Sequence, residues 1–133
     1  MSNAESADAF DPVAFARSWE QAWNAHDLDA VLAHFADDAV FTSPLAVQLL
    51  PGTGGVLRGK AAIAGYWRIG LEKIADLHFT VEAVYTGIDV LVINYRNQAG
   101  NLVCEVLHLR DGLVVSGAGT YRGPDVSTAT GAN

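Results

Sequence analysis

The feature that most constrains the fold is a change of hydrophobic pattern near Leu77. From there on, four apolar runs rich in β-branched and aromatic residues are separated by the short sequences TGID, QAGN and RDG. Asn, Asp and Gly are typical of β-hairpin turns, because they tolerate the positive φ angles that tight turns need. The second half of the chain is therefore expected to form a four-stranded antiparallel meander.

The first half of the chain has the period of helices instead. Asp11 and Pro12 are a typical helix start, with the Asp as N-cap and the Pro at the first helical position. Apolar residues then recur at helical spacing, again after the cap residue Asp27, and again from about Lys60. Before the third helix, AVFTSP predicts a strand that stops at Pro44, and a Gly-rich loop follows it.

This order of elements indicates an α+β fold in a single domain. Three N-terminal helices are expected to be wrapped by a strongly curved antiparallel sheet, which leaves a pocket at its open end. A chain of 133 residues, 50% of them hydrophobic, can build one core but not two. We expect the domain to span residues 10–122, with flexible termini at 1–9 and 123–133, where the sequence is small and polar.

Turn lengths predict which side chains share the concave face of the meander. If Ala99 and Gly100 form a two-residue turn, Asn94 lies opposite Glu105 and Arg96 lies one diagonal step away. If RDG is a three-residue turn with its Gly at positive φ, the last strand presents its glycines to the same face, whereas a two-residue turn would flip that strand. The other residues expected on this face are Phe79, Val81, Ala83, Tyr85, Val92, Val103, Leu107, Val115, Gly117, Gly119 and Tyr121.

The opposite face of the meander is also expected to be apolar. It would carry Leu91, Ile93, Tyr95, Cys104, Val106 and His108. Such a face is too apolar to be a solvated sheet surface, so we expect a homodimer through the outer face of the sheet.

Glu105 is the strongest candidate for chemistry. An acidic side chain among apolar neighbours is desolvated, and its pKa rises toward the range used in acid–base catalysis. Asn94 and Tyr121 are the expected catalytic partners. The alternative is a structural role, in which Glu105 pairs with Arg96 or bonds to one of those two neighbours. Arg96 has a second possible role, as a residue at the pocket rim that captures an anionic ligand.

Aromatic side chains are expected to line the pocket around a flat or cyclic molecule. Trp19, Tyr66 and Tyr121 are the best candidates for ligand contact, because each has a polar group that can orient a ligand. The further candidates are Trp23, Trp67 and Tyr85. For each of them the alternative is an ordinary core aromatic.

Other conspicuous motifs do not indicate a site. Asp37 and Asp38 are adjacent, and adjacent residues entering a strand point in opposite directions, so we expect them to form a structural turn. The four histidines lack metal-binding spacing, and the Gly-rich segment PGTGGVLRGK lacks the order of a phosphate-binding loop. We therefore expect neither a metal nor a cofactor.

Composition narrows the range of partners. The net charge is −7 with only eight Lys and Arg residues, which excludes a basic surface for nucleic acid and makes anionic membranes improbable partners. No apolar run is long enough to span a membrane, and Cys104 is the only cysteine, so no intrachain disulfide forms. These features predict a cytoplasmic protein whose partner is a small molecule.

Three segments resemble the SnoaL-like group of the nuclear transport factor 2-like superfamily, which is related to ketosteroid isomerases and polyketide cyclases. They are WNAHDLDAVLAHFADDAVFTSP (23–44), LRGKAAIAGYW (57–67) and HLRDGLVVSGAGTY (108–121). The resemblance extends over nearly all of residues 10–122 and implies a cone-shaped sheet around the helices. Members of this superfamily include enzymes, binding proteins and interaction domains, so the resemblance is more specific for fold than for chemistry.

The residues of the isomerase reaction are missing from this resemblance. That reaction uses an Asp base, with a Tyr and a protonated Asp that hold the oxyanion. Alignment to the family puts Ser43 at the base position, Trp19 at the Tyr position and Leu107 at the second Asp position. Steroid isomerisation by that route is not expected, and Ser43 becomes a candidate for ligand contact.

Two functions remain open at this point. One is a pocket protein for an apolar or cyclic metabolite that acts as a cofactor-free isomerase, cyclase or hydratase with Glu105 as its acid or base. The other is a non-catalytic ligand-binding or protein-interaction module. The sequence does not decide whether the chain is an enzyme.

Overall fold

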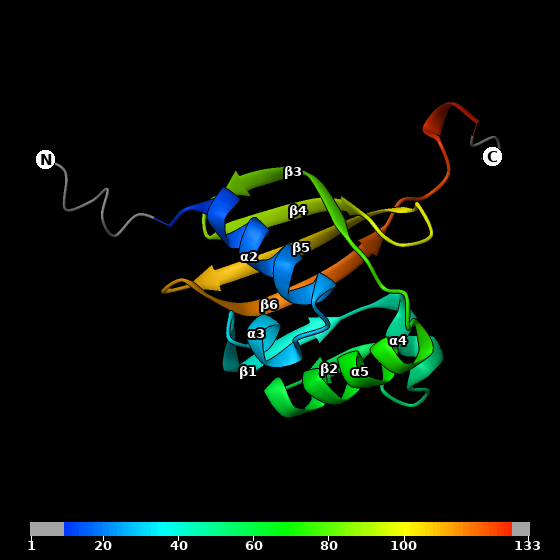
Figure 1. Cartoon of the computed structure of the whole chain (residues 1–133), viewed down its shortest axis with the longest axis horizontal. Helices are drawn as coiled ribbons and strands as arrows, with labels where there is room; N and C mark the ends of the chain where they lie inside the picture. The colour runs from blue at the N-terminus through cyan, green and yellow to red at the C-terminus, as the bar shows by residue number, and fades with distance from the viewer. Residues whose placement is uncertain (1–9, 129–133) are drawn as a thin grey trace, which may run out of the picture.

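The structure is a computed structural model that describes residues 10–128. In its first half, the helices α2 (Pro12–Asn24), α3 (Leu28–Leu32), α4 (Pro44–Leu49) and α5 (Lys60–Lys73) alternate with the strands β1 (Phe35–Thr42) and β2 (Val56–Arg58). The strands β3 (Thr80–Gly87), β4 (Val90–Arg96), β5 (Leu102–Arg110) and β6 (Leu113–Tyr121) follow, and a 3-10 turn (Val126–Thr128) ends the described chain. The predicted α+β order is confirmed (Figure 1).

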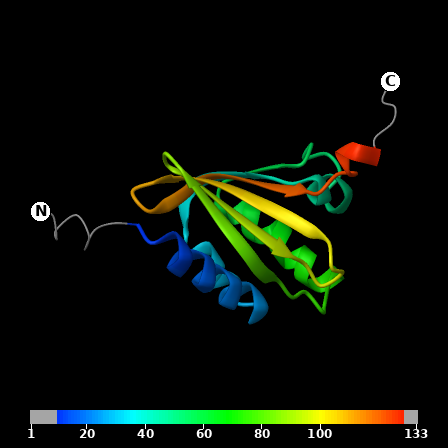
Figure 2. The ribbon, with the colours of Figure 1, turned by 90° about the horizontal axis from the view of Figure 1, so that it is seen from above.

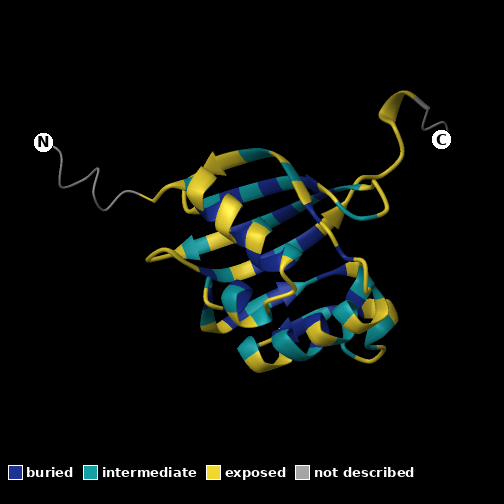
Figure 3. Cartoon of the chain, in the orientation of Figure 1, coloured by how far each residue is buried: buried dark blue, intermediate teal, exposed yellow. Residues whose placement is uncertain are grey.

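The strands form one curved sheet in the order β2-β1-β6-β5-β4-β3, and the helices lie on one side of it (Figure 2). The sheet does not close into a barrel, as expected. One pairing departs from an all-antiparallel sheet, because β1 runs parallel to β6. Buried residues lie along the sheet and on the helix faces that meet it (Figure 3).

Local sequence signals explain where the helices begin. The Oδ1 atom of Asp11 accepts a hydrogen bond from the Ala14 N–H at 3.0 Å, and that of Asp27 accepts one from Ala30 at 3.1 Å. Both predicted N-caps are therefore confirmed. The third predicted helix, α5, begins at Lys60.

Two segments of the first half differ from expectation. Asp37 and Asp38 lie within β1 rather than in a turn before it, at a point where the pairing with β6 shifts register. Residues 44–49 form the short helix α4 rather than a loop, because Ser43 caps it by accepting the Leu45 N–H at 3.2 Å.

The predicted register between β4 and β5 is wrong by one residue. The strands are joined by residues 97–101, so that Ile93 rather than Asn94 lies opposite Glu105. The Asn97 side chain causes this, because its Oδ1 accepts hydrogen bonds from the backbone N–H groups of Ala99 and Asn101. A one-residue slip moves every β4 side chain to the other face.

The slip changes what each face of the sheet carries. Leu91, Ile93 and Tyr95 point into the core and are at most 4% exposed. Asn94 lies on the outer face, where its Nδ2 donates to the Cys104 Sγ at 3.4 Å. The outer face therefore lacks three of the apolar residues on which the homodimer was predicted, and it retains Cys104, Val106 and His108.

A second register shift affects β3. The pairing with β4 is irregular between Val81 and Ala83, and Tyr85 lies opposite Val92 on the outer face, where it is 61% exposed. The expectation that Tyr85 faces the pocket is wrong for this reason.

The last strand agrees better with the prediction. Gly112 has φ 80°, Gly117 lies opposite Leu107, and Gly119 lies opposite Glu105, all as expected from a bulged turn. The pairing shifts between His108 and Leu109, so that Val114 rather than Val115 is the buried residue.

The termini were predicted to be flexible. Residues 1–9 and 129–133 lie outside the described part of the chain, and residues 123–127 are exposed. No helix among the described residues is long and apolar enough to cross a membrane.

Candidate functional site

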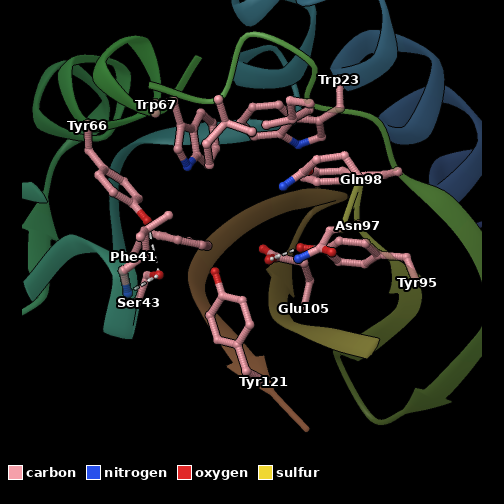
Figure 4. A pocket seen from close by; sticks show the side chains of 15 residues that line it. Trp23, Phe41, Ser43, Tyr66, Trp67, Tyr95, Asn97, Gln98, Glu105 and Tyr121 are labelled. Atoms are coloured by element: carbon pink, nitrogen blue, oxygen red, sulfur yellow. Dashed lines mark hydrogen bonds between the residues drawn. The ribbon is translucent and has the colours of Figure 1, made fainter. Parts of the chain in front are cut away.

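A cavity of about 80 Å³ lies between α5, α4 and the concave face of the sheet. One water molecule needs about 10–15 Å³ on the same measure, so the cavity has room for a small organic ligand. Seven of its fifteen lining residues are aromatic (Figure 4). Its polar groups come from α5, β4, β5 and β6, from the loop between β4 and β5, and from the junction between β1 and α4. These polar residues are Ser43, Tyr66, Tyr95, Asn97, Gln98, Glu105 and Tyr121.

Glu105 is the only acidic residue among the side chains that line this cavity, and it is 8% exposed. Tyr95 donates a hydrogen bond to its Oε1 atom at 3.2 Å. Burial raises the pKa of the Glu105 carboxyl to about 7, although the Tyr95 hydrogen bond opposes the rise. Glu105 is therefore a carboxyl group that changes protonation near neutral pH.

Glu105 has no cationic partner among residues 10–128. The predicted candidate, Arg96, lies on the outer face, where its Nε donates to the Glu82 Oε2 at 2.8 Å. The structural alternative of a Glu105–Arg96 pair is therefore wrong, because the register slip turns Arg96 away from the cavity.

Three hydroxyl groups gather opposite this carboxyl. The Tyr66 hydroxyl donates to the Ser43 Oγ at 3.0 Å, and burial raises the pKa of Tyr66 to about 12. Tyr121 is 45% exposed, but its hydroxyl points into the cavity (Figure 4). Burial raises the pKa of Tyr121, the charge on Glu105 adds to the rise, and a hydrogen bond with Ser43 opposes it.

A glycine lets the carboxyl and the hydroxyl groups come together. A Cβ atom on Gly119 would lie 3.4 Å from the Glu105 Oε1 and 3.6 Å from the Ser43 Oγ. The two polar groups therefore flank the same point of β6, with no side chain between them.

Two tryptophans supply further donors. The rings of Trp23 and Trp67 meet edge to face with their centroids 5.0 Å apart, and their indole nitrogens lie on the cavity side (Figure 4). Each residue is 6% exposed, and neither N–H donates to another residue within the described chain. A ligand oxygen in the cavity can accept from them.

The structure brings only part of the predicted site together. Glu105, Tyr121, Ser43, Tyr66 and Trp67 line the cavity. The outer face of the sheet carries Asn94, Arg96 and Tyr85, because the registers of β4 and β3 differ from the predicted ones. Trp19 is 1% exposed and lies behind the cavity wall, where it stacks on Phe79 and meets Tyr95 edge to face.

The sequence indicates Trp23 only as one of several possible lining aromatics, ranked after Trp19, and it does not predict that Tyr95 lines the cavity. Trp23 follows Trp19 by one helical turn, so the helix period already placed both on one face of α2, and only packing decides which of them reaches the cavity. Tyr95 was not predicted because the expected register placed it on the outer face of the sheet. Residues 10–128 contain no cluster of three or more His, Cys, Asp or Glu side chains that could hold a metal ion.

Comparison with known proteins identifies the fold and the family. The SnoaL-like domain family matches residues 16–117. A SnoaL-like protein of unknown function from Burkholderia thailandensis is 44% identical, with a TM-score of 0.79 over 84% of this chain and 94% of that one. None of the curated proteins matches the sequence.

More distant structures share the fold alone. IdmH, a putative polyketide cyclase from Streptomyces antibioticus, is 18% identical with a TM-score of 0.68, over 84% of this chain and 91% of that one. TerC, co-crystallised with polyporic acid, is 15% identical with a TM-score of 0.70, over 84% of this chain and 92% of that one.

Proposed function

The chain belongs to the SnoaL-like domain family, and we propose that its cavity binds a small apolar or cyclic metabolite and performs cofactor-free acid–base chemistry. The observation that carries this proposal is Glu105, a buried carboxyl with a pKa of about 7 and no cationic partner in the described chain. A group that ionises near the working pH can both accept and return a proton.

The chemistry follows from what faces Glu105. As a carboxylate it removes a proton from an acidic C–H or from water, and as a carboxylic acid it returns a proton. Tyr121, with the indole N–H groups of Trp23 and Trp67, donates hydrogen bonds to negative charge that develops on a ligand oxygen. These donors replace Asn94 and Trp19, which lie elsewhere. Isomerisation, cyclisation and hydration all contain such a proton transfer.

Two of the distant structures are consistent with such a ligand. IdmH is described as a putative polyketide cyclase, and TerC was crystallised with polyporic acid. The cavity of this chain, with seven aromatic residues among the fifteen that line it, suits a flat ring of the kind that such compounds contain.

The proposal can be tested without knowing the natural substrate. 1-Indanone is a flat bicyclic ketone with exchangeable protons beside its carbonyl group, and NMR in D2O measures their exchange. We expect the wild-type protein to accelerate this exchange and Glu105→Gln to abolish the acceleration with the fold intact. Glu82→Gln is the matched control, because it removes a carboxylate on the outer face.

The alternative function is a non-catalytic ligand-binding module. The Tyr95–Glu105 hydrogen bond favours it, because it gives one carboxyl oxygen a structural partner. Binding of 1-indanone with equal exchange rates in wild type and Glu105→Gln would support this alternative and contradict the acid–base role.

A further inference from the structure

The two tryptophans of the cavity carry hydrogen-bond donors that the described chain leaves without an acceptor. Trp23 and Trp67 are each 6% exposed, and their indole nitrogens face the cavity (Figure 4). Neither N–H donates a hydrogen bond to any of residues 10–128. Because buried polar groups are almost always paired, these two N–H groups indicate an acceptor that enters the cavity from outside the described chain.

The two donors lie across the cavity from the candidate base. Trp23 belongs to α2 and Trp67 to α5, on the helical side, whereas Glu105 belongs to β5 in the sheet. Figure 4 shows the two indole rings on the opposite side of the cavity from Glu105 and Tyr121. A ligand can therefore present an oxygen to the indole groups while another of its atoms faces the carboxyl.

No cationic side chain accompanies these donors. None of the fifteen residues that line the cavity is Lys, Arg or His, and Glu105 is the only carboxylic acid among them. A carboxylate or phosphate in this cavity would lose its hydration without gaining a counter-charge, and it would meet a second negative charge whenever Glu105 is ionised. The cavity is therefore suited to an uncharged acceptor.

We propose that the indole N–H groups of Trp23 and Trp67 form a subsite for the oxygen of an uncharged carbonyl compound, and that the cavity rejects carboxylates of the same shape. A carbonyl oxygen accepts and does not donate, which matches a wall that offers donors alone. The inference rests on the proposed ligand pocket, and it adds the chemical class of the ligand and the wall at which its oxygen binds.

Three probes of similar shape separate the effect of an acceptor from that of a charge. Acetophenone has a carbonyl oxygen, ethylbenzene lacks the acceptor, and benzoate is an anion at pH 8. Ethylbenzene would displace water from the indole groups without replacing its hydrogen bonds. We expect acetophenone to bind about five- to tenfold more tightly than ethylbenzene, since one net hydrogen bond has that effect, and about tenfold or more tightly than benzoate.

Two results of these titrations would overturn the inference. Acetophenone that binds no more tightly than ethylbenzene, or that does not bind, would show that the indole groups are not a subsite for a carbonyl oxygen. Benzoate that binds as tightly as acetophenone would show that the cavity does not reject carboxylates.

The indole N–H groups report the contact directly, and Trp19 is an internal control because it packs behind the cavity wall. In 15N-labelled wild-type protein, acetophenone should move the indole resonance of Trp23, of Trp67 or of both further downfield than ethylbenzene does, and should leave that of Trp19 in place. Through-space contacts assign the three resonances without a variant, because Trp19 packs against Tyr95 and Trp67 against Phe35. Bound acetophenone that moves neither cavity indole further than ethylbenzene does would contradict the subsite.

Substitutions give a second measurement. Trp23→Phe and Trp67→Phe remove an N–H group and keep an aromatic ring, so at least one of them should lower the acetophenone-to-ethylbenzene affinity ratio about threefold or more. Trp19→Phe is the matched control and should leave the ratio unchanged. A merely structural role of the two cavity tryptophans would weaken both probes equally, and an unchanged ratio in both variants would overturn the inference.

The outcomes separate this inference from the acid–base proposal. If the indole resonances respond as expected while Glu105→Gln leaves the proton exchange of 1-indanone unchanged, the subsite is supported and the catalytic role of Glu105 is contradicted. If exchange depends on Glu105 but acetophenone leaves both cavity indoles unshifted, the acid–base proposal is supported and the subsite is wrong.

Discussion

The Glu105 carboxyl couples the stability of the fold to pH. Its pKa is about 7 in the folded protein, against an ordinary value of 4.5. Below pH 4.5 both the folded and the unfolded states hold the proton, so the group has no differential effect. Between these values only the folded state keeps it, so stability falls as the pH rises, and the loss is complete above pH 7.

This linkage gives a prediction for the Glu105→Gln variant. The wild-type protein should lose up to about 3 kcal/mol of unfolding free energy from this group between pH 4.5 and pH 8. The variant should lack that slope, because Gln has no charge to bury. Urea denaturation at several pH values measures it, and parallel pH profiles for the two proteins would contradict a raised pKa.

Two glycines of β6 differ in how much space surrounds them. A Cβ atom on Gly117 would lie 2.9 Å from the Phe41 Cδ1 and 3.1 Å from the Leu107 Cδ2, which is closer than packed atoms normally come. The nearest atom to a Cβ on Gly119 would be the Glu105 Oε1 at 3.4 Å, an ordinary contact.

We therefore expect Gly117→Ala to destabilise the protein by about 1–3 kcal/mol through overpacking. Gly119→Ala should change stability less and should weaken probe binding, because its methyl group enters the cavity between Glu105 and Ser43. Thermal unfolding and probe titration of both variants make the comparison. Equal stability losses would show that local space does not distinguish the two positions.

The loop between β4 and β5 decides which side chains reach the site. The Oδ1 atom of Asn97 holds this loop by accepting hydrogen bonds from the backbone N–H groups of Ala99 and Asn101, at 3.0 and 3.1 Å. The loop length in turn fixes the register that turns Tyr95 inward and Arg96 outward.

Removing that side-chain oxygen should weaken the loop. We expect Asn97→Ala to lower the free energy of unfolding by about 1–2 kcal/mol, since both backbone donors lose their partner. Asn97→Asp keeps the acceptor and is the matched control, which should retain most of the stability. Chemical denaturation of the three proteins tests this, and a loss as large in Asn97→Asp would contradict the role of the acceptor oxygen.

The loop also shows what the sequence can and cannot predict. The helix caps at Asp11 and Asp27 and the inward glycines of β6 follow from local chemistry, and they were predicted correctly. The β4 register was predicted wrongly, because Ala99-Gly100 matches a two-residue turn, whereas hydrogen bonds of the Asn97 and Arg96 side chains hold the longer loop. This one-residue difference in register determines whether Asn94, Arg96 and Tyr95 face the cavity or the outer side of the sheet. Whether Trp19 or Trp23 lines the cavity depends on packing between helix and sheet, which no local pattern contains.

The outer face of the sheet is the surface through which the chain is predicted to form a homodimer. The homodimer stays a prediction, with Val92, Cys104 and Val106 as the half-buried residues of that face. Light scattering should give the mass of two chains, and Val106→Glu should convert the dimer to a monomer, because a buried unpaired charge at an interface is unfavourable. A wild-type protein that is monomeric at micromolar concentration would show this prediction to be wrong.

The position of β6 bears on how the protein is made. β6 lies between β1 and β5, so it alone joins the strand pair β1–β2 to the strands β3–β5. Ser43 follows β1, Glu105 lies on β5, and Gly119 of β6 separates them. During synthesis on the ribosome, both side chains are made before residues 113–121, but nothing holds them together until those residues are in place. A nascent or truncated chain that lacks β6 therefore contains Ser43 and Glu105 but has no formed cavity. We expect it to bind a ligand only after β6 has paired with β1 and β5.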